Sequence, residues 1–254
     1  MHIDVVTIFP ELFPPFLSTS LLGRAMEKAL LQVEIHDLRQ FTLDRHRVVD
    51  DEPYGGGGGR VMIAEPWLRA VREIPGEEAT HRILLSPQGR PLDDARVRRL
   101  ATRPRLMLLC GRYEGIDERV LERVVDEEIS IGDYVLSGGE VPAMVLIEAL
   151  SRQIPGVVGL ADSVEHDSFR NGLLDHPQYT RPRTVDGLEA PDVLLSGDHA
   201  AIDRWRRRAS LAATLEKRPD LLRAAELDEE QIRWLEEIRR ERAPRAAATA
   251  QEEE

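Results

Sequence analysis

The sequence contains a single cysteine, Cys110, and that scarcity excludes two kinds of site. One cysteine cannot form an intramolecular disulfide, and it cannot supply the several thiolates of a cysteine-based zinc site. Cys110 closes the apolar run RLMLLC, so we expect it to be a buried strand residue. A chain without disulfides is typical of a reducing compartment, and we therefore expect a cytoplasmic protein.

Long hydrophobic runs are absent as well. No apolar stretch of the sequence approaches the ~20 residues that a membrane-spanning helix needs, so we expect no membrane partner. The opening stretch MHIDVVTIFPELF lacks a basic region followed by an apolar block, so we expect no secretory signal there. With 42% hydrophobic residues, the 254-residue chain can bury a sizeable core, in one large domain or in a medium domain with a smaller appendage.

Basic residues are fewer than acidic residues, and the formal net charge is -12. Taken alone, this argues against a polyanionic partner. Arginines are nevertheless concentrated in three short segments, 96–100, 181–183 and 204–208. Because nucleic-acid binding needs only one basic face, the net charge does not exclude it, although solvated helix faces would give the same pattern.

Strand-like and helix-like segments alternate through the first two-thirds of the chain, which is typical of an α/β domain with a parallel sheet. The predicted strands are 3–8, 33–37, 82–85, 106–110 and 134–136. The predicted helices are 21–31, 67–74, 92–102 and 142–154. The last of these is apolar on nearly every side, so we expect it to pack against the sheet or against a partner subunit.

The pattern changes after residue 154. The stretch that begins VVGLADSVEHDSF lacks periodicity and is rich in Asp, Ser, Gly and Pro, as linkers and functional loops are. From Gly197 onward the pattern is helical. The final stretch, APRAAATAQEEE, is predicted to be a frayed or disordered tail.

Three glycine-bearing loops are each predicted to follow a strand: SPQGRPL, GRYEGIDER and SGGE. Ligands of open α/β sheets bind outside the carboxyl ends of the strands, so these loops predict one shared pocket for a small ligand. None of them matches the GxGxxG dinucleotide fingerprint, and SGGE lacks the lysine of a phosphate-binding loop. A nucleotide-hydrolysing enzyme is therefore disfavoured.

A fourth loop, RHRVVDDEPYGGGGGRVM at residues 45–62, contains five successive glycines. Such a run costs conformational entropy when it becomes ordered, and packing alone does not explain it. A flexible linker is one interpretation. We prefer a loop that becomes ordered when a large ligand binds, with Asp50, Asp51 and Tyr54 as polar contacts.

These segments together resemble a known family. Between residues 3 and 219 the chain is similar to the bacterial tRNA (guanine-N1)-methyltransferases in the order and spacing of its motifs. These motifs include HRVVDDEPYGGGGG, CGRYEGIDERV, SIGDYVLSGGE, GLLDHPQYTRP and LLSGDH. That family belongs to the knotted, or SPOUT, methyltransferases and modifies guanine 37, just 3′ of the anticodon. The resemblance implies an α/β fold with a trefoil-knotted parallel-sheet domain at 1–160, a linker with the catalytic acid at 161–175, and a helical tRNA-binding domain with a disordered tail at 176–254.

The resemblance also implies S-adenosylmethionine as the methyl donor, held by the glycine-bearing loops. The donor-binding residues that the family pattern gives in this sequence are Leu85, Ser86, Pro87, Gly111, Tyr113, Glu114, Ile131, Gly132, Asp133, Tyr134, Val135, Leu136, Gly138 and Gly139. The residues that it gives for tRNA contacts are Asp50, Tyr54, Gly55, Ser168, Arg181 and Arg206. Two positions depart from the family pattern: Arg60 stands where an apolar residue is expected, and His166 stands where a second acid often precedes the catalytic aspartate.

Methylation of guanine N1 requires loss of its proton, which places negative charge largely on O6. A base near N1 and a fixed cation near O6 are therefore expected. The candidate bases in the linker are Asp162, Glu165, His166 and Asp167, of which the resemblance selects Asp167. It selects Arg152 as the cation; a helix C-terminal charge favoured by the dipole is the alternative interpretation. A free aspartate, with a pKa of about 3.9, is a weak base, so partial burial or a concerted proton transfer is needed.

In the family the donor pocket comes from one subunit, and the acid with the helical domain comes from the other. The resemblance thus implies a homodimer with a composite active site. It also implies a dependence on Mg2+, although no ligand cluster in the sequence identifies a metal site. Two alternatives stay open: a knotted methyltransferase that acts on another RNA atom, such as a ribose 2′-hydroxyl, and a non-catalytic RNA-binding protein that has kept the fold.

Overall fold

The computed structural model describes residues 1–76, 80–159 and 167–249 of the chain. The chain divides into two compact units, Met1–Ala161 and Asp162–Glu254, and each is described here by itself. In the described ranges no helix is long and apolar enough to cross a membrane.

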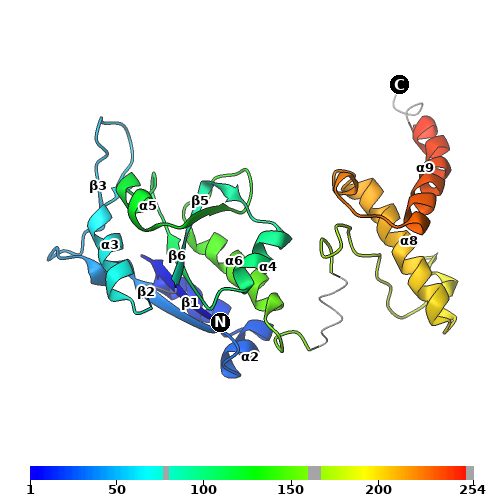
Figure 1. The fold of residues 1–254 in the computed structure, drawn as a ribbon, viewed down its shortest axis with the longest axis horizontal. Helices are drawn as coiled ribbons and strands as arrows, with labels where there is room; N and C mark the ends of the chain where they lie inside the picture. The colour runs from blue at the N-terminus through cyan, green and yellow to red at the C-terminus, as the bar shows by residue number, and fades with distance from the viewer. Residues whose placement is uncertain (77–79, 160–166, 250–254) are drawn as a thin grey trace. The chain divides into compact units, whose positions relative to one another are not determined.

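The first unit is built on a five-stranded sheet in which all neighbouring strands are parallel (Figure 1). In spatial order its strands are β2 (Gln32–Asp37), β1 (His2–Thr7), β6 (Arg105–Cys110), β5 (Thr80–Pro91) and β7 (Glu127–Ser130). The predicted α/β architecture with a parallel sheet is thus confirmed. The trefoil knot stays a prediction.

The central strand β6 shows why the sheet is covered on both faces. Its residues are apolar in succession, and alternate side chains point to opposite faces. Leu106 and Leu108 pack into one buried cluster, whereas Met107 and Leu109 pack into the other. Cys110 ends this strand and is fully buried, as predicted. Burial of each large apolar side chain contributes about 1.5–3 kcal/mol, so this strand anchors both layers.

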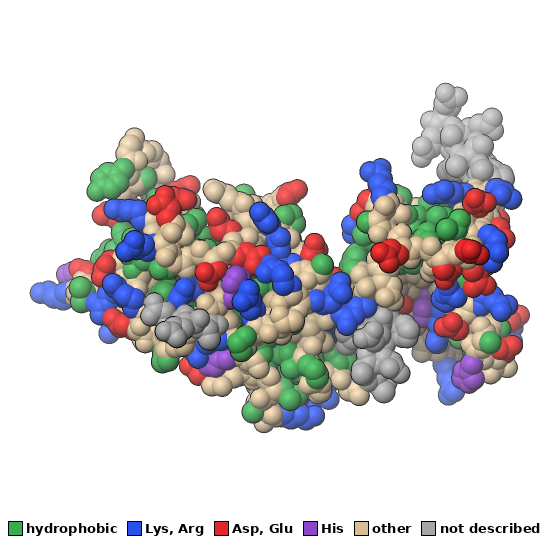
Figure 2. Space-filling view, viewed as in Figure 1, with side chains coloured by type: hydrophobic (Ala, Val, Ile, Leu, Met, Phe, Trp, Pro, Cys, Tyr) green, Lys and Arg blue, Asp and Glu red, His purple; other side chains and the backbone are tan. Residues whose placement is uncertain are grey.

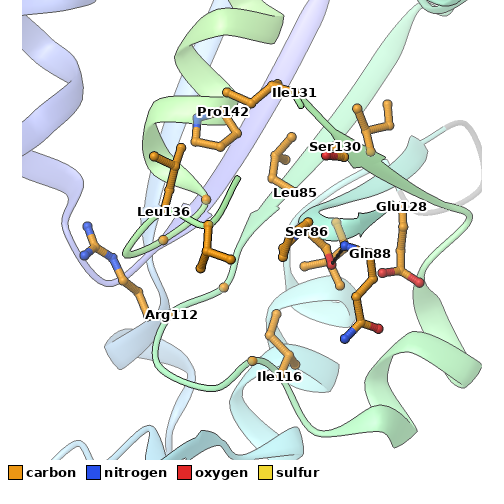
Figure 3. Close-up of a pocket in the computed structure, with 18 of the residues that line it drawn as sticks. Leu85, Ser86, Gln88, Arg112, Ile116, Glu128, Ser130, Ile131, Leu136 and Pro142 are labelled. Atoms are coloured by element: carbon orange, nitrogen blue, oxygen red, sulfur yellow. Dashed lines mark hydrogen bonds between the residues drawn. The ribbon is translucent and has the colours of Figure 1, made fainter. Parts of the chain in front are cut away.

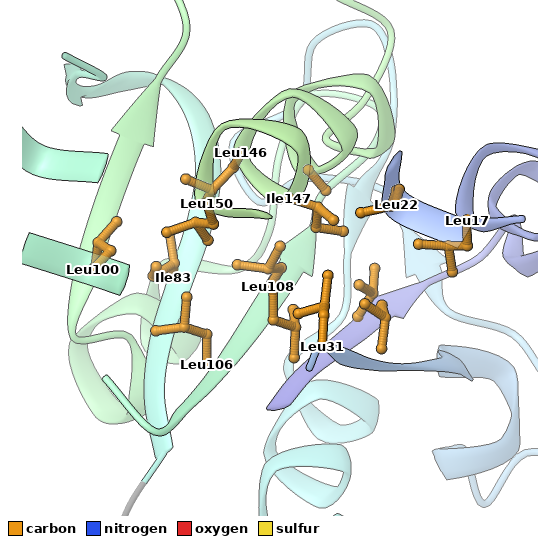
Figure 4. Close-up of a cluster of buried hydrophobic side chains, with 14 of the residues drawn as sticks. Leu17, Leu22, Leu31, Ile83, Leu100, Leu106, Leu108, Leu146, Ile147 and Leu150 are labelled. Carbon is orange, nitrogen blue, oxygen red and sulfur yellow. The ribbon is translucent and has the colours of Figure 1, made fainter. Parts of the chain in front are cut away.

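Helices cover the two faces of the sheet. One face carries α1 (Phe13–Leu17), α2 (Ser20–Glu27), α4 (Asp94–Ala101) and α6 (Glu140–Gln153). The other carries α3 (Ala64–Glu73) and α5 (Glu118–Val124), with the short 3-10 helix η2 (Leu38–Phe41) beside α3, while the 3-10 helix η1 (Pro10–Leu12) follows β1. Figure 4 shows Leu146, Ile147 and Leu150 of α6 directed onto the sheet residues of the first cluster. The expectation that this apolar helix packs on the sheet is confirmed.

Two elements near the glycine-bearing loops differ from the sequence prediction. Residues 134–136 are not a strand: the last strand of the sheet is β7, and the chain after it forms a turn in which the Tyr134 amide donates to the Gly132 carbonyl at 2.9 Å. The SPQGR segment lies inside the long strand β5, and both Leu85 and Arg90 pair with Ile129, so the residues between them bulge out of the sheet. The loop is therefore an excursion from one strand.

The glycine run lies in the loop that connects β3 (Asp50–Asp51) to β4 (Val61–Met62), and these two strands pair as a short antiparallel hairpin. Four of its glycines have positive φ, from 73° to 118°, a conformation that side-chain-bearing residues rarely adopt. The hairpin is fixed to the neighbouring loop by backbone bonds: the Glu114 amide donates to the Arg60 carbonyl at 3.0 Å, and the Met62 amide donates to the Gly115 carbonyl at 2.9 Å. The sequence predicted a loop here but not its attachment.

The second unit contains two long helices, α8 (His199–Lys217) and α9 (Glu229–Thr249), which pack on each other. Its shorter elements are β8 (Thr184–Val185), β9 (Leu188–Glu189), η4 (Asp192–Leu195) and η5 (Leu221–Arg223). Leu211, Trp234 and Ile238 form its buried core, so this unit has a hydrophobic centre of its own. Helix α9 continues to Thr249, so residues 243–249 of the predicted tail are helical, and residues 250–254 lie outside the described ranges.

Candidate functional site

A cavity of about 320 Å³ opens beside the bulge of β5 and at the carboxyl ends of β6 and β7, where the three glycine-bearing loops meet (Figure 3). Its volume falls within the range of small-molecule sites. Its walls come from these loops, from β5 and β7, and from the first turns of α5 and α6: Leu84, Leu85, Ser86, Pro87, Gln88, Gly111, Arg112, Tyr113, Glu114, Gly115, Ile116, Glu118, Leu121, Glu128, Ile129, Ser130, Ile131, Gly132, Tyr134, Val135, Leu136, Ser137, Gly138, Gly139 and Pro142. The structure thus brings the three loops to one cavity.

All but one of the residues that the family pattern gives for donor binding line this cavity. The exception is Asp133, which is exposed and is not among the lining residues. Asp133 lies in the turn that replaces the predicted strand at 134–136, where strand alternation no longer decides which side chains face inward.

Close backbone packing shapes the floor of the cavity. The Gly139 amide donates to the Gly111 carbonyl at 2.9 Å, which ties the third loop to the second. A Cβ atom on Gly139 would lie 2.8 Å from the Cα of Cys110, closer than side chains tolerate. Glycine is thus required at 139 by the close approach of two chain segments.

An ion pair between the partly exposed Arg112 and the buried Glu140 joins the second loop to the start of α6. Arg112 Nε donates to Glu140 Oε2 at 2.9 Å, and the Thr7 hydroxyl donates to Glu140 Oε1 at 2.8 Å. The Arg112 guanidinium also lies 4.5 Å from the centre of the Phe9 ring. Burial raises the pKa of the nearby Cys110 thiol well above its usual range, and the charge of Glu140 adds to the effect. Cys110 is therefore held as a neutral thiol below the cavity.

Acidic side chains outnumber basic ones among the lining residues. Glu114, Glu118 and Glu128 carry negative charge, and Arg112, the one lining cation, is already paired with Glu140. Within the described residues Glu128 Oε2 is buried without a hydrogen-bond partner, and Figure 3 shows this side chain beside Gln88. An acidic cavity with an unsatisfied acceptor suits a ligand that brings positive charge and hydrogen-bond donors, and it does not suit a triphosphate.

The sequence analysis missed several lining residues. Gln88, Ser130 and Pro142 lie within or next to the quoted loops, so their positions beside the predicted glycines were a usable signal. Arg112 is inside the second loop, and its role could not be anticipated because its partner Glu140 follows in another loop. Glu128 looks like an ordinary surface acid in the sequence DEEIS, and only the position of β7 brings it to the cavity.

The predicted tRNA contacts of the first unit lie on the hairpin. Tyr54 is fully exposed, and Gly55 has open space around it. Asp50 is already engaged, because Arg60 Nε donates to its carboxylate and Arg60 Nη2 donates to its backbone carbonyl at 2.9 Å. The arginine that departs from the family pattern therefore binds the acid predicted to contact tRNA.

The predicted base, Asp167, begins a tight turn in the second unit. Its backbone carbonyl accepts from the Arg170 amide at 3.2 Å, and the Phe169 amide donates to the Leu173 carbonyl at 2.7 Å. Next to it, Ser168 Oγ accepts from the Asp175 amide at 2.9 Å. Asp162, Glu165 and His166, the other candidate bases, lie outside the described residues.

Arg152 lies in the last turn of α6, in the first unit. The cavity is at the other end of this helix, where Pro142 contributes to its wall. Ten residues separate Pro142 from Arg152, which corresponds to about 15 Å of helix. Arg152 is therefore remote from the cavity of its own chain, and its role as the cation near O6 stays a prediction.

Most arginines of the basic segments are engaged in ion pairs. Arg96 and Arg99 both contact Glu127, so the segment 96–100 is structural. On α8, Arg207 pairs with Asp228 and Glu230, and Arg208 pairs with Glu241. In Figure 2 basic and acidic side chains are accordingly interspersed on the face in view.

Two predicted RNA contacts differ from these paired arginines. Arg206 is exposed on α8, and Arg181 is exposed in the loop before β8. Neither has an acidic partner within 4.0 Å among the described residues, whereas the neighbouring Arg183 contacts Asp192 at 2.7 Å. These two side chains thus remain available to a polyanion.

Comparisons with known proteins find a family and relatives that match most of the chain. The family model described as tRNA (Guanine-1)-methyltransferase TrmD matches residues 1–224. The chain is 51% identical over 249 residues to the tRNA (guanine-N(1)-)-methyltransferase of Proteus mirabilis, which covers 97% of this chain and 100% of the relative. It is 51% identical to the protein of that name from Moorella thermoacetica, covering 96% and 99% of the two chains. The chain therefore belongs to the tRNA (guanine-N1)-methyltransferase family.

Proposed function

We propose that this protein transfers a methyl group from S-adenosylmethionine to N1 of guanine 37 in tRNA. The observation that carries the proposal is the acidic, glycine-walled cavity in a chain of this family. Relatives that match nearly the whole chain have the name tRNA (guanine-N(1)-)-methyltransferase.

The residues of the cavity fit the proposed donor. When bound, S-adenosylmethionine supplies an electrophilic sulfonium methyl group. Its sulfonium and ammonium charges match the excess of acidic side chains, and its hydroxyl and ammonium groups can donate to the unsatisfied Glu128 Oε2. Leu85, Ile131 and Leu136 offer apolar surface for an adenine ring.

Asp167 and Arg152 would act on the guanine. Asp167 would accept the proton of N1 as the methyl group is transferred, so that the ring nitrogen attacks with its lone pair. Arg152 would hold the negative charge that develops on O6, because a guanidinium is a permanent cation with a planar set of donors. The turn that begins at Asp167 fixes its backbone, which supports its use as a positioned base.

The length of α6 supports a composite site in a homodimer. The cavity and Arg152 belong to opposite ends of one helix, so a single chain would need a partner to bring a cation and a cavity together. Val141 and Val145 are 55% and 42% exposed on this helix, next to the cavity, and offer an apolar surface to a second copy. Under this proposal Asp167 of one subunit acts on a guanine placed beside the donor cavity of the other.

We assign tRNA contacts to the exposed side chains Tyr54, Arg181 and Arg206, and to the backbone around Gly55 and Ser168. Asp50 contributes only if Arg60 releases it. A dependence on Mg2+ and a cytoplasmic location are part of the proposal through the family resemblance.

A single substitution tests the base assignment. In Asp167→Ala, turnover of unmodified tRNA with a methyl-labelled donor should fall by about 10²–10⁴-fold, the usual contribution of general base catalysis. Donor binding should persist, because Asp167 is not among the residues of the cavity.

Arg152→Lys separates charge from geometry. It keeps a positive charge but loses the planar fork, so turnover should fall while donor binding is retained.

Unchanged turnover in Asp167→Ala would refute the role of Asp167 and direct attention to His166 or a water molecule. Donor binding without any transfer to tRNA by the wild-type protein would favour a non-catalytic RNA-binding protein.

A further inference from the structure

A group of histidine and carboxylate side chains lies at the amino ends of β1 and β2, whereas the cavity lies at the carboxyl ends of the strands. Its members are His2, Asp4 and Glu34, and the ligand atoms that they offer all lie within 4.8 Å of one another. Of the residues that the structure describes, these alone form such a group of three. The proposed methyl transfer does not use them.

The pairing of the two strands explains why these side chains meet. Asp4 of β1 is the direct partner of Glu34 in β2, so both point to the same face of the sheet. His2 is two residues before Asp4 and shares that face, because side chains alternate along a strand. The group is therefore fixed by the sheet register and not by loop conformation.

The distances suit a small, four-coordinate cation. His2 Nε2 lies 3.3 Å from Asp4 Oδ1, and 3.9 Å from Glu34 Oε1. Ligands that each lie about 2.0–2.1 Å from a tetrahedral zinc ion are separated by about 3.3 Å from one another. The His2–Asp4 pair already has this separation. Glu34, whose side chain is 47% exposed, can close the remaining gap by a change of rotamer.

Neighbouring side chains fix the orientation of the Asp4 carboxylate, as hydrogen-bonding residues around a metal site fix a carboxylate ligand. Its side chain is fully buried, and its Oδ2 accepts from Arg105 Nε at 2.8 Å. Its Oδ1 lies 2.9 Å from His36 Nε2. The second contact of Oδ1 is His2 Nε2 at 3.3 Å, and a cation bound between these two atoms would replace that contact. Hydrogen-bonded carboxylate ligands of this kind are usual in metal sites.

We propose that His2, Asp4 and Glu34 form a binding site for a divalent transition-metal ion of the Zn2+ class, with water in the fourth position. An imidazole ligand favours zinc and its neighbours over Mg2+. Two carboxylates, of which Asp4 is also paired with Arg105, offset part of the charge of the ion. The ion would join β1 to β2 and stabilise the amino edge of the sheet.

The test uses the full-length protein after treatment with a chelator, titrated with Zn2+ alone by calorimetry and with Co2+ by visible absorption. The wild type should bind one Zn2+ per chain at this site and unfold at a higher temperature when Zn2+ is present. His2→Gln and Glu34→Gln should each lose that site and the thermal shift, whereas Mg2+ should give no shift in any of the proteins. His36→Gln, which removes an outer-shell contact, should weaken Zn2+ binding about 10-fold.

The exposed histidine His199 in the second unit provides the matched control. His199→Gln should leave both the Zn2+ stoichiometry and the thermal shift unchanged, which separates the site from adventitious binding by surface histidines. Thermal unfolding without metal checks that His2→Gln and Glu34→Gln remain folded. A wild-type protein that takes up no Zn2+, or Zn2+ binding that survives in both ligand variants, overturns the proposal.

Discussion

Arg112 and Glu140 form a partly buried ion pair that links two of the loops around the cavity, with Nε and Oε2 2.9 Å apart. The Glu140 side chain is 1% exposed and also accepts from the Thr7 hydroxyl of β1. The pair therefore connects the donor cavity to the central sheet.

Removal of one partner of this pair should be costly. Glu140→Ala leaves the Arg112 guanidinium without its counter-charge, and we expect the free energy of unfolding to fall by about 3 kcal/mol, with weaker donor binding. The double variant Arg112→Met with Glu140→Leu should lose less stability than Glu140→Ala, because it leaves no uncompensated charge. Urea denaturation measures both. Equal losses in the two variants would show that packing, and not the charge, is responsible.

Gly139 should not tolerate a side chain. In Gly139→Ala the added methyl group meets the backbone of Cys110 at 2.8 Å, so the third loop must shift. We expect a loss of about 1–3 kcal/mol in stability and a clear loss of donor affinity, measured by denaturation and by calorimetric titration.

Gly159→Ala is the matched control for this substitution, because a Cβ there meets no atom of the described residues within 4 Å. It should leave both quantities near their wild-type values. Wild-type donor affinity in Gly139→Ala would contradict the account of the cavity floor.

Glu127 should make stability depend on pH in the acid range. Burial raises the pKa of Glu127, but hydrogen bonds from Arg99 and His81 and the nearby arginine charges outweigh it, so the pKa lies below its ordinary value. A carboxylate with a depressed pKa stabilises the fold above its unfolded-state pKa of about 4.3, and this contribution is lost as the pH falls through the folded-state pKa.

The Glu127→Gln variant should therefore be less stable than the wild type at pH 6, and the difference should shrink below pH 4. Denaturation curves across this range measure the difference. A gap that stays constant with pH would show that ionisation of Glu127 does not contribute.

Two neighbouring arginines of α8 should separate RNA binding from stability. Arg206 is exposed, and Arg206→Ala should weaken tRNA binding and reduce the salt dependence of the affinity by about one unit of slope without loss of stability. Arg207 pairs with Asp228 and Glu230 and lies 5.4 Å from the centre of the Trp234 ring. Arg207→Ala should therefore lower the stability of the second unit. A loss of stability in Arg206→Ala with unchanged tRNA binding, or a loss of tRNA binding in Arg207→Ala with unchanged stability, would contradict the proposed RNA surface.

Much of the first unit could be predicted from the sequence because β1, β5 and β6 contain runs of apolar residues. Residues 106–110 and 3–8 were predicted close to the observed β6 and β1. The apolar run Tyr134-Val135-Leu136 misled the prediction, since it reads as a strand but forms a turn whose members line the cavity. Hydrophobicity alone does not distinguish burial against a core from contact with a ligand.

Other features depended on contacts between distant segments. Asp117 is the N-cap of helix α5, and its side chain accepts from the Arg119 amide at 3.0 Å. The helix was not predicted from the sequence because it is short. The basic segment 96–100 could not be recognised as structural before Glu127 of β7 was placed beside it. Whether a cluster of charged residues stabilises the fold or binds a ligand can be decided only when its ion-pair partners are known.

The most direct test of the central claim is the position and chemistry of the transferred methyl group. Unmodified tRNA with guanine at positions 36 and 37 is incubated with the wild-type protein and labelled S-adenosylmethionine, and the product nucleoside is identified and mapped. The account predicts 1-methylguanosine at position 37. A methyl group on a ribose 2′-hydroxyl, or on any base other than guanine 37, would contradict it.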